Sequence, residues 1–195
     1  LLGEKLLFTA IEEATALPTF LEYGDQRAMS LIGTDGSQLP LEAADFERVT
    51  TQAPEGAACA VLALALDWLQ DVVVIDLPGL GSVSETHHVY TLAQIQQADA
   101  ILYLVEPRGP SLSDLNMLKR IREYGKRVKV IVTRWDEVEA AIARGEKSPN
   151  LQQWAAQIEQ KTELKVRLAT ASHHGHGREE ILEFMSRAKE DIGHI

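Results

Sequence analysis

The chain has 195 residues, 45% of them hydrophobic, which is enough for one well-packed core. Its formal net charge of −10 argues against binding to nucleic acid or directly to an anionic membrane, since both are themselves negative. The single cysteine, Cys59, cannot form an internal disulfide, which fits a reduced, cytosolic setting. The longest apolar run, residues 57–66, is far shorter than the roughly 20 residues that cross a bilayer.

Strands and helices are predicted to alternate along the first half of the chain. Residues 17–23 and 27–32 are predicted to be two strands joined by a hairpin turn at Gly24-Asp25. Residues 41–52 are predicted to form a peripheral helix. Residues 57–66 alternate as in a strand, although their alanines leave a buried helix open.

The second half continues this alternation. Apolar spacing predicts strands at residues 101–105, 127–132 and 165–170, and helices at residues 88–97, after Ser111, after Ser148 and at residues 181–192. Ser111 and Asp114 have the spacing of a capping box, and Ser148-Pro149 that of a cap followed by an N1 proline.

A first candidate site follows residues 72–75, Val-Val-Val-Ile, which favour a parallel strand buried on both faces. Asp76 stands at the carboxyl end of this strand, the edge where ligands of open α/β sheets bind. Its carboxylate can hold the water shell of Mg²⁺, and the amide of Gly79 can meet a terminal phosphate. A plain turn is the alternative, because Asp-Leu-Pro-Gly is also a good turn sequence.

A second candidate site follows residues 127–132, where the sequence reads Thr133-Arg134-Trp135-Asp136. The carboxylate of Asp136 can accept hydrogen bonds from the ring N–H and the exocyclic amine of guanine, while Arg134 covers the base plane. Adenine would leave this carboxylate unsatisfied, at a cost of about 1–3 kcal/mol. The alternative is that Asp136 caps a helix.

These motifs together resemble the GTP-binding domain of the dynamin family, most closely the bacterial dynamin-like proteins. The resemblance rests on residues 1–7, 14–19, 76–79, 98–105 and 133–136, and it covers nearly the whole chain. It implies that residues 1–195 form one partial GTP-binding domain. The fold implied is α/β, of the three-layer P-loop-NTPase type (Ras-like/dynamin), with a mainly parallel sheet flanked by helices.

The resemblance also implies a catalytic set and a metal site. Thr15 would be the switch threonine that closes on Mg²⁺, and Asp76 with Gly79 would form the second switch, with Asp76 holding the ion through water.

The base-binding residues follow from the same resemblance. Thr133, Arg134 and Asp136 would read the guanine of GTP or GDP, and Ala171 and Ser172 would back the ring through backbone amides. The family usually has Lys where Arg134 stands, and a flat guanidinium can cover the base as well.

The phosphate loop, Gly-x-x-x-x-Gly-Lys-Ser/Thr, does not occur in the sequence. Leu1-Leu2-Gly3 reads as the end of the helix that this loop would open, so we expect the first strand and the phosphate loop to precede Leu1 in the native protein. In the related fold that strand lies between the one ending at Ile75 and the one at residues 101–105, and each would otherwise keep an unpaired edge. This fragment alone is therefore expected to be inactive.

Residues 170–177 bring three histidines, His173, His174 and His176, close together, which raises a metal site. No cysteine or carboxylate accompanies them inside the segment, and its glycines favour a flexible, solvated loop near the base. His87 and His88 are expected to be solvated, and nothing in the sequence nominates a catalytic base.

Three functions remain open. The leading one is a GTP-hydrolysing domain of a bacterial dynamin-like protein that forms a homodimer or homo-oligomer through its nucleotide face and drives membrane remodelling. It would be cytoplasmic, at the inner face of the membrane, with membrane contacts outside this chain. The alternatives are a pseudo-GTPase that lacks the phosphate loop and serves as a binding or assembly module, or a non-membrane, translation-factor-type GTPase.

Overall fold

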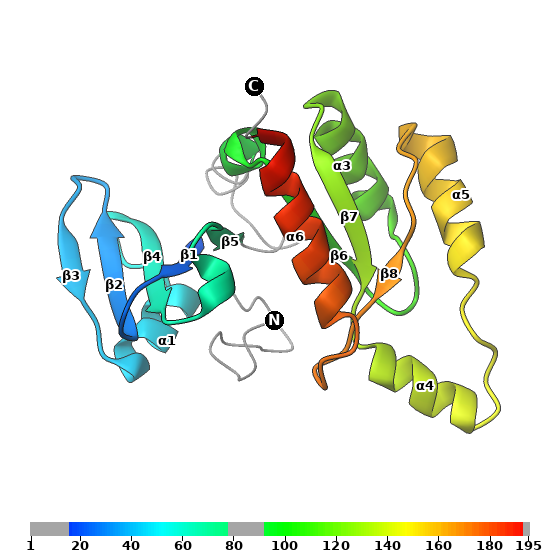
Figure 1. Ribbon diagram of the computed structural model, residues 1–195, viewed down its shortest axis with the longest axis horizontal. Helices are drawn as coiled ribbons and strands as arrows, with labels where there is room; N and C mark the ends of the chain where they lie inside the picture. The colour runs from blue at the N-terminus through cyan, green and yellow to red at the C-terminus, as the bar shows by residue number, and fades with distance from the viewer. Residues whose placement is uncertain (1–15, 78–91, 193–195) are drawn as a thin grey trace. The chain divides into compact units, whose positions relative to one another are not determined.

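The computed structural model describes residues 16–77 and 92–192, and of residues 189–192 it describes the backbone alone. The chain divides into two compact units, with the boundary between Leu92 and Ala93. The described residues of each are called the N-terminal unit and the C-terminal unit (Figure 1). The predictions made for residues 1–15 and 78–91 lie outside the described residues.

The N-terminal unit contains a five-stranded mixed sheet in the order β3-β2-β4-β1-β5. Its elements are β1 (Thr19–Tyr23), β2 (Ala28–Gly33), β3 (Gln38–Pro40), α1 (Ala43–Thr51), β4 (Ala57–Leu64), the 3-10 helix η1 (Asp67–Leu69) and β5 (Val74–Asp76). Strand β4 lies at the centre, parallel to β1 and antiparallel to β2. The core joins β1, α1, β4 and η1 through Leu21, Phe46, Leu62 and Leu69.

The structure resolves the ambiguity of residues 57–66 in favour of a strand. Ala60, Leu62 and Leu64 are buried, whereas Val61 and Ala63 between them are only partly buried. This two-residue period is that of a strand with one face on the core.

The predicted hairpin at Gly24-Asp25 is wrong, because β4 lies between β1 and β2. The Gly24 amide donates to the Leu64 carbonyl at 3.1 Å, which continues the β1–β4 pairing beyond the end of β1. A Cβ at Gly24 would lie 2.8 Å from the Cβ of Ala63, so glycine lets the chain cross β4 closely. The chain bends at Asp25 and Gln26, but the long apolar β4 takes both strands as partners.

Strand β5 also differs from its prediction. Its partner among the described residues is β1, which runs antiparallel to it. Its three residues are only partly buried, and Val73 just before it is 56% exposed. The β-branched residues therefore predicted a strand correctly. The prediction that this strand is parallel to its neighbour and buried on both faces was wrong.

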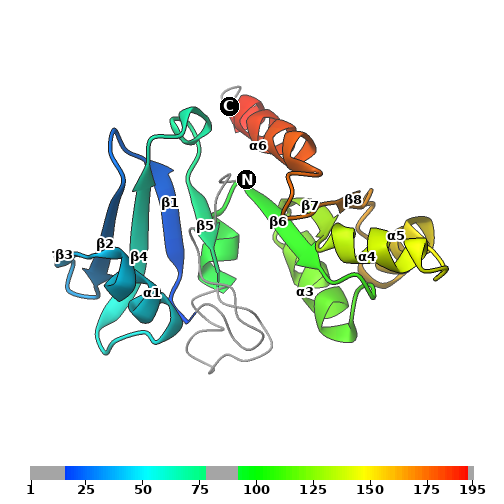
Figure 2. The ribbon, with the colours of Figure 1, turned by 90° about the horizontal axis from the view of Figure 1, so that it is seen from below.

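The C-terminal unit contains a parallel sheet in the order β6-β7-β8. Its elements are β6 (Ala100–Val105), α3 (Leu112–Glu123), β7 (Arg127–Val132), α4 (Trp135–Ala143), α5 (Leu151–Thr162), β8 (Ala169–Thr170) and α6 (Arg178–Ile192). Helix α6 covers one face of the sheet and α3 the other (Figure 2), and α5 packs against α3. This unit confirms the α/β prediction of a parallel sheet between helix layers, whereas the N-terminal sheet is mixed.

The ends of the helices test the predicted caps. Helix α3 has the predicted capping box, in which Ser111 Oγ accepts from the Asp114 amide at 3.2 Å and Asp114 Oδ2 accepts from the Ser111 amide at 2.7 Å. Helix α5 is capped by Asn150, whose Oδ1 accepts from the Gln153 amide at 3.0 Å. The prediction of Ser148 as that cap was wrong by two residues, because the helix begins only at Leu151.

Asp114 also ties α3 to the sheet, because its Oδ1 accepts a hydrogen bond from the Tyr103 hydroxyl at 2.9 Å. Burial, and then the Asp114 carboxylate, raise the pKa of Tyr103 far above its ordinary value. The hydroxyl therefore stays a donor at physiological pH, and one carboxylate serves both as a helix cap and as a link between two layers.

Replacing Asp114 by alanine removes the carboxylate half of the capping box and the Tyr103 contact together, whereas the Ser111 hydroxyl can still accept from the backbone amide of residue 114. We expect the free energy of unfolding to fall by about 1–2 kcal/mol, because the Tyr103 hydroxyl and the Ser111 amide each lose their acceptor. Asp45→Ala is the matched control, since Asp45 also lies in a first helical turn but makes only an exposed pair with Arg48 at 2.7 Å. Urea unfolding of both variants measures the difference, and equal losses would contradict the role given to Asp114.

Candidate functional site

Hydrogen bonds tie together the segments that follow the three strands of the C-terminal unit. The amide of Thr133, just after β7, donates to the Val105 carbonyl at the end of β6 at 3.0 Å, and its hydroxyl donates to the same carbonyl at 3.2 Å. The Ala171 amide, just after β8, donates to the Val132 carbonyl at 2.9 Å. Two of the predicted base-site residues, Thr133 and Ala171, therefore meet at one edge of the sheet.

Arg134 links β7 to α4 in a left-handed backbone conformation, with φ 52° and ψ 41°. Such a conformation costs an L-residue other than glycine roughly 1–2 kcal/mol. The turn is held from both sides, because the Trp135 amide donates to the Ala171 carbonyl at 3.0 Å and the Glu137 amide to the Arg134 carbonyl at 3.1 Å. With Arg134 in this conformation, α4 begins at Trp135, directly after the carboxyl end of β7.

The side chain of Arg134 lies between two carboxylates. Its guanidinium is 3.8 Å from Glu106 and 3.7 Å from Glu137, and about half of the side chain is exposed. Glu106 also pairs with Arg108 at 2.5 Å. The sequence analysis did not single out Glu106, although it follows β6 at the same edge, and that position was the available signal.

Asp136 lies in the first turn of α4, whose N-cap position belongs to Arg134. The alternative that Asp136 caps this helix is therefore wrong. Its side chain is 28% exposed, and Oδ2 lies 3.2 Å from Nδ1 of His173. Its Oδ1 is buried and has no hydrogen-bond partner among the residues that the structure describes. A buried carboxylate oxygen without a partner is costly, and such a group calls for an explanation such as a ligand.

The loop that follows β8 is closed by its own backbone. The Ser172 amide donates to the His176 carbonyl at 3.2 Å, and the Gly175 amide donates to the Ser172 carbonyl at 3.3 Å. A Cβ at Gly177 would lie 2.1 Å from the Thr170 carbonyl oxygen, so glycine is required there. Gly177 therefore allows the turn to close, while the predicted flexibility of the loop stays a prediction.

The amides of Ala171 and Ser172, which the resemblance offers to a guanine ring, both donate within the protein in this arrangement. The Ala171 bond to Val132 at 2.9 Å belongs to the sheet edge, whereas the Ser172 bond to His176 at 3.2 Å is longer and lies inside the loop. Ser172 is therefore the amide that a ligand could recruit with less disturbance.

The histidines separate into two groups. The side chains of His173 and His174 share a cluster with Asp136, in which the ligand-type atoms all lie within 4.8 Å of one another. His176 instead places Nε2 2.7 Å from the Thr170 hydroxyl. Residues 170–177 contain no carboxylate, and Asp136 of α4 supplies one. The sequence could not reveal this contact, because Asp136 lies far from the histidines along the chain.

The predicted magnesium site belongs to the other unit. Asp76 is the last residue of β5, where it stands opposite Thr19 of β1, and it is partly buried. Thr15 and Gly79, its predicted companions, lie outside the described residues, as do His87 and His88.

Among residues 16–77 and 92–192, no helix combines the length and the apolar character needed to span a membrane.

Sequence comparison finds relatives among the dynamins. Residues 1–135 match the sequence model of the dynamin family. A bacterial dynamin-like protein of Nostoc punctiforme is 28% identical over 160 residues, which are 73% of this chain and 23% of that protein. An uncharacterized protein in the xynA 3′ region of a Caldicellulosiruptor species is 24% identical over 143 residues, 70% of this chain and 36% of that protein. The chain thus spans only about a quarter to a third of these relatives.

Solved structures show the same fold. Two chains from structures of an oligomerised bacterial dynamin pair, described as providing a mechanism for long-range sensing and tethering of membranes, superpose with TM-scores of 0.64 and 0.67. Both are 16% identical in sequence, and the match covers 91% and 97% of this chain and 31% and 32% of theirs. Because the family match extends over residues 1–135 of 195, the chain belongs to the dynamin family.

Proposed function

We propose that the chain is the GTP-binding domain of a bacterial dynamin-like GTPase and that Asp136 recognises guanine. The observation that carries the proposal is the placement of Asp136 in the first turn of α4, with a buried oxygen that has no hydrogen-bond partner among the described residues. The family match supports the binding of a guanine nucleotide, although the match ends at residue 135, one residue before Asp136.

The chemistry of Asp136 suits guanine. Guanine presents two adjacent donors, a ring N–H and an exocyclic amine, and a carboxylate can accept from both. Adenine presents an acceptor at the ring position and would leave one oxygen unsatisfied, at about 1–3 kcal/mol. His173 now stands 3.2 Å from Oδ2, so guanine would displace this imidazole, whose side chain is 69% exposed and free to turn away.

Arg134 and the loop complete the proposed pocket. The side chain of Arg134 is about half exposed and offers a flat guanidinium to the base, and the carboxylates of Glu106 and Glu137 at 3.8 and 3.7 Å restrain it. The Ser172 amide would exchange the His176 carbonyl for the guanine carbonyl oxygen, beside Ala171. Thr133 holds the backbone on which all of these residues depend.

Hydrolysis also needs residues that bind Mg²⁺ and the phosphates. We assign Asp76 to the water shell of Mg²⁺, with Thr15 and Gly79 as its companions around the terminal phosphate. The phosphate-loop motif does not occur in the 195 residues, so GTP turnover is proposed for the intact protein and not for these residues alone.

Self-association and membrane remodelling belong to the same proposal. The structural relatives come from an oligomerised bacterial dynamin pair connected with the sensing and tethering of membranes. By analogy, this protein would form homodimers or homo-oligomers through its nucleotide face and act at the cytoplasmic face of a membrane, through segments other than these.

A pseudo-GTPase that serves as an assembly module is the competing proposal. The intact protein separates the two, because measurable GTP turnover, abolished by Asp76→Ala, excludes the pseudo-GTPase.

The base assignment makes a prediction about selectivity. In the intact protein, Asp136→Asn should weaken GDP binding at least tenfold, about 1.4 kcal/mol, and should strengthen binding of xanthosine diphosphate. Xanthine carries an oxygen in place of the exocyclic amine, so the asparagine amide can donate where the carboxylate accepted. Calorimetry with GDP and with xanthosine diphosphate measures both changes in affinity.

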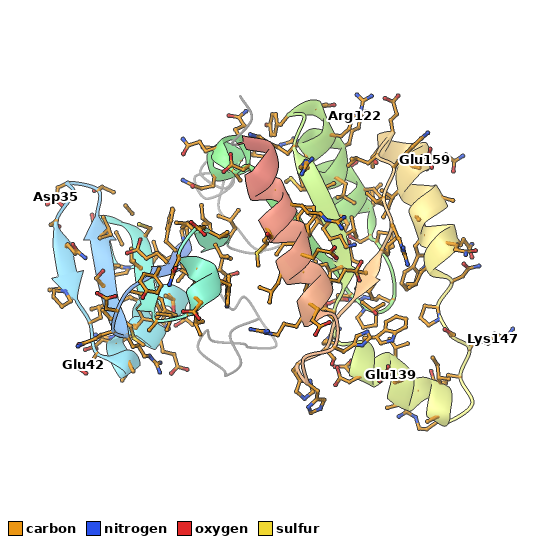
Figure 3. All side chains as sticks on the ribbon, in the orientation of Figure 1. Asp35, Glu42, Arg122, Glu139, Lys147 and Glu159 are labelled. Carbon is orange, nitrogen blue, oxygen red and sulfur yellow. The ribbon has the colours of Figure 1, made fainter. Side chains whose placement is uncertain are left out.

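Glu139→Gln is the control for that experiment, because it makes the same change of charge on an exposed side chain of α4 (Figure 3). It should leave both affinities unchanged. Undiminished GDP binding by Asp136→Asn would remove Asp136 from the site.

Backbone strain at Arg134 makes a second prediction. Arg134→Gly relieves the left-handed conformation but gives up about 0.5–1 kcal/mol of backbone entropy, so the free energy of unfolding should stay equal or rise by up to about 1.5 kcal/mol. GDP affinity should nevertheless fall, because the surface over the base is lost.

Glu163→Gly is the matched control, since Glu163 ends α5 with φ 61° and is the other non-glycine residue with positive φ among the described residues. It should change stability in the same direction without affecting GDP. A large loss of stability in Arg134→Gly would show that this side chain holds the fold and is not reserved for a ligand.

A further inference from the structure

We propose that Asp136, His173 and His174 form a binding site for a late first-row divalent metal ion, of which Zn²⁺ is the probe of choice. The three side chains come from α4 and from the loop after β8, and their ligand-type atoms lie within 4.8 Å of one another.

The distances fit one shared ion. Zn²⁺ binds imidazole nitrogen at about 2.0–2.1 Å and carboxylate oxygen at about 2.0–2.2 Å, so two tetrahedral ligands stand roughly 3.3 Å apart. The gap between Asp136 Oδ2 and His173 Nδ1 is 3.2 Å. The ligand-type atoms of all three side chains lie within 4.8 Å of one another. The His174 ring therefore has to move only a short way toward Asp136 and His173, and it is exposed.

The loop presents both rings to the same side. His173 and His174 are the central residues of a turn closed by the Gly175 amide and the Ser172 carbonyl at 3.3 Å. Their ring centroids are 3.7 Å apart, with the planes tilted by 42°. The backbone therefore holds two imidazoles beside one carboxylate before any ion binds.

The charge of Asp136 supports the same site. Its other oxygen, Oδ1, is buried and has no hydrogen-bond partner among the described residues. An ion at Oδ2 would neutralise the carboxylate and lower the cost of keeping that oxygen away from water.

The donor set selects the class of ion. Two imidazoles and one carboxylate suit Zn²⁺, Ni²⁺, Co²⁺ or Cu²⁺, whereas Mg²⁺ and Ca²⁺ prefer oxygen ligands alone. Three protein ligands leave a position for water, as in an open zinc site.

Metal and guanine would compete for Asp136. This consequence rests on the proposed function, because it requires Asp136 to read the base. A carboxylate that holds an ion cannot also accept two hydrogen bonds from guanine, so the metal would act as an inhibitor of nucleotide binding that is distinct from the Mg²⁺ of the phosphates.

The primary test uses the 195-residue chain without nucleotide, in a Cys59→Ser background that removes the thiol as a competing ligand. Calorimetry with Zn²⁺ should find a site that weakens at least tenfold in the double variant His173→Gln/His174→Gln. Titration with Co²⁺ should give the visible absorption of a tetrahedral site in the parent and not in the double variant.

His176→Gln is the matched control, since His176 is in the same loop but lies against the Thr170 hydroxyl at 2.7 Å, and it should bind Zn²⁺ like the parent. Asp136→Asn should weaken binding as the double variant does. The proposal is overturned if the parent binds no Zn²⁺, or if the double variant or Asp136→Asn binds as tightly as the parent.

A second test, on the intact protein, addresses the competition. Zn²⁺ should weaken GDP binding in the parent and not in His173→Gln/His174→Gln, which also corrects for Zn²⁺ bound to the nucleotide itself. Equal effects in both proteins overturn the competition. Failure of the proposed function is separate, since it would appear as unchanged GDP affinity in Asp136→Asn without any metal.

Discussion

The candidate site depends on one backbone constraint, the left-handed conformation of Arg134. The chain leaves β7 at Val132 and begins α4 at Trp135, so it changes direction within two residues. The Trp135 amide then reaches the Ala171 carbonyl at 3.0 Å, which joins the start of α4 to the loop after β8. A right-handed conformation at Arg134 would point α4 elsewhere and would separate Asp136 from that loop.

This conformation is easier for glycine or asparagine than for arginine. Strain of this kind is found where the surroundings enforce it, and it often marks a site of function. The surroundings here are the hydrogen bonds of Thr133 and Ala171 across the strand ends, so the same contacts that build the sheet edge also maintain the strain. Stability and the position of the site therefore have a common origin.

Sequence reasoning predicted those parts that depend on local chemistry. The capping box of Ser111 and Asp114 was predictable because both of its partners lie within one turn of chain. The position of Thr133 and Asp136 just beyond the carboxyl end of β7 was predictable because both follow directly after an apolar run that forms a strand. For residues 57–66 the sequence left strand and buried helix open, because every residue from Ala57 to Leu66 is apolar; the burial of Ala60, Leu62 and Leu64 on one face decides for the strand.

The parts that depend on distant partners were not predictable. The turn at Gly24 gave no sign that β4 would separate β1 from β2, because that outcome depends on a strand more than thirty residues later. The valines before Asp76 could not show that β5 would pair antiparallel with β1. The histidine loop, for the same reason, gave no sign of its carboxylate, which arrives from α4.

Among the described residues, β5 and β6 each pair on one side alone, β5 with β1 and β6 with β7. Val73 beside β5 and Leu104 in β6 are 56% and 59% exposed. Each of the two strands is thus the last of its own sheet among the described residues, and an end strand can accept a further strand through its backbone.

The burial of Asp136 Oδ1 is common to both proposals made for this carboxylate. A charged oxygen without a partner raises the free energy of the unliganded protein, and any ligand that neutralises or hydrogen-bonds the carboxylate recovers part of that energy as affinity. Guanine would do so with two neutral donors, and a metal ion with its charge. Because both would use the same carboxylate, a gain for one would be a loss for the other. The exposed imidazole of His173, 3.2 Å from Oδ2, would stay beside the carboxylate for a metal ion and turn away for guanine.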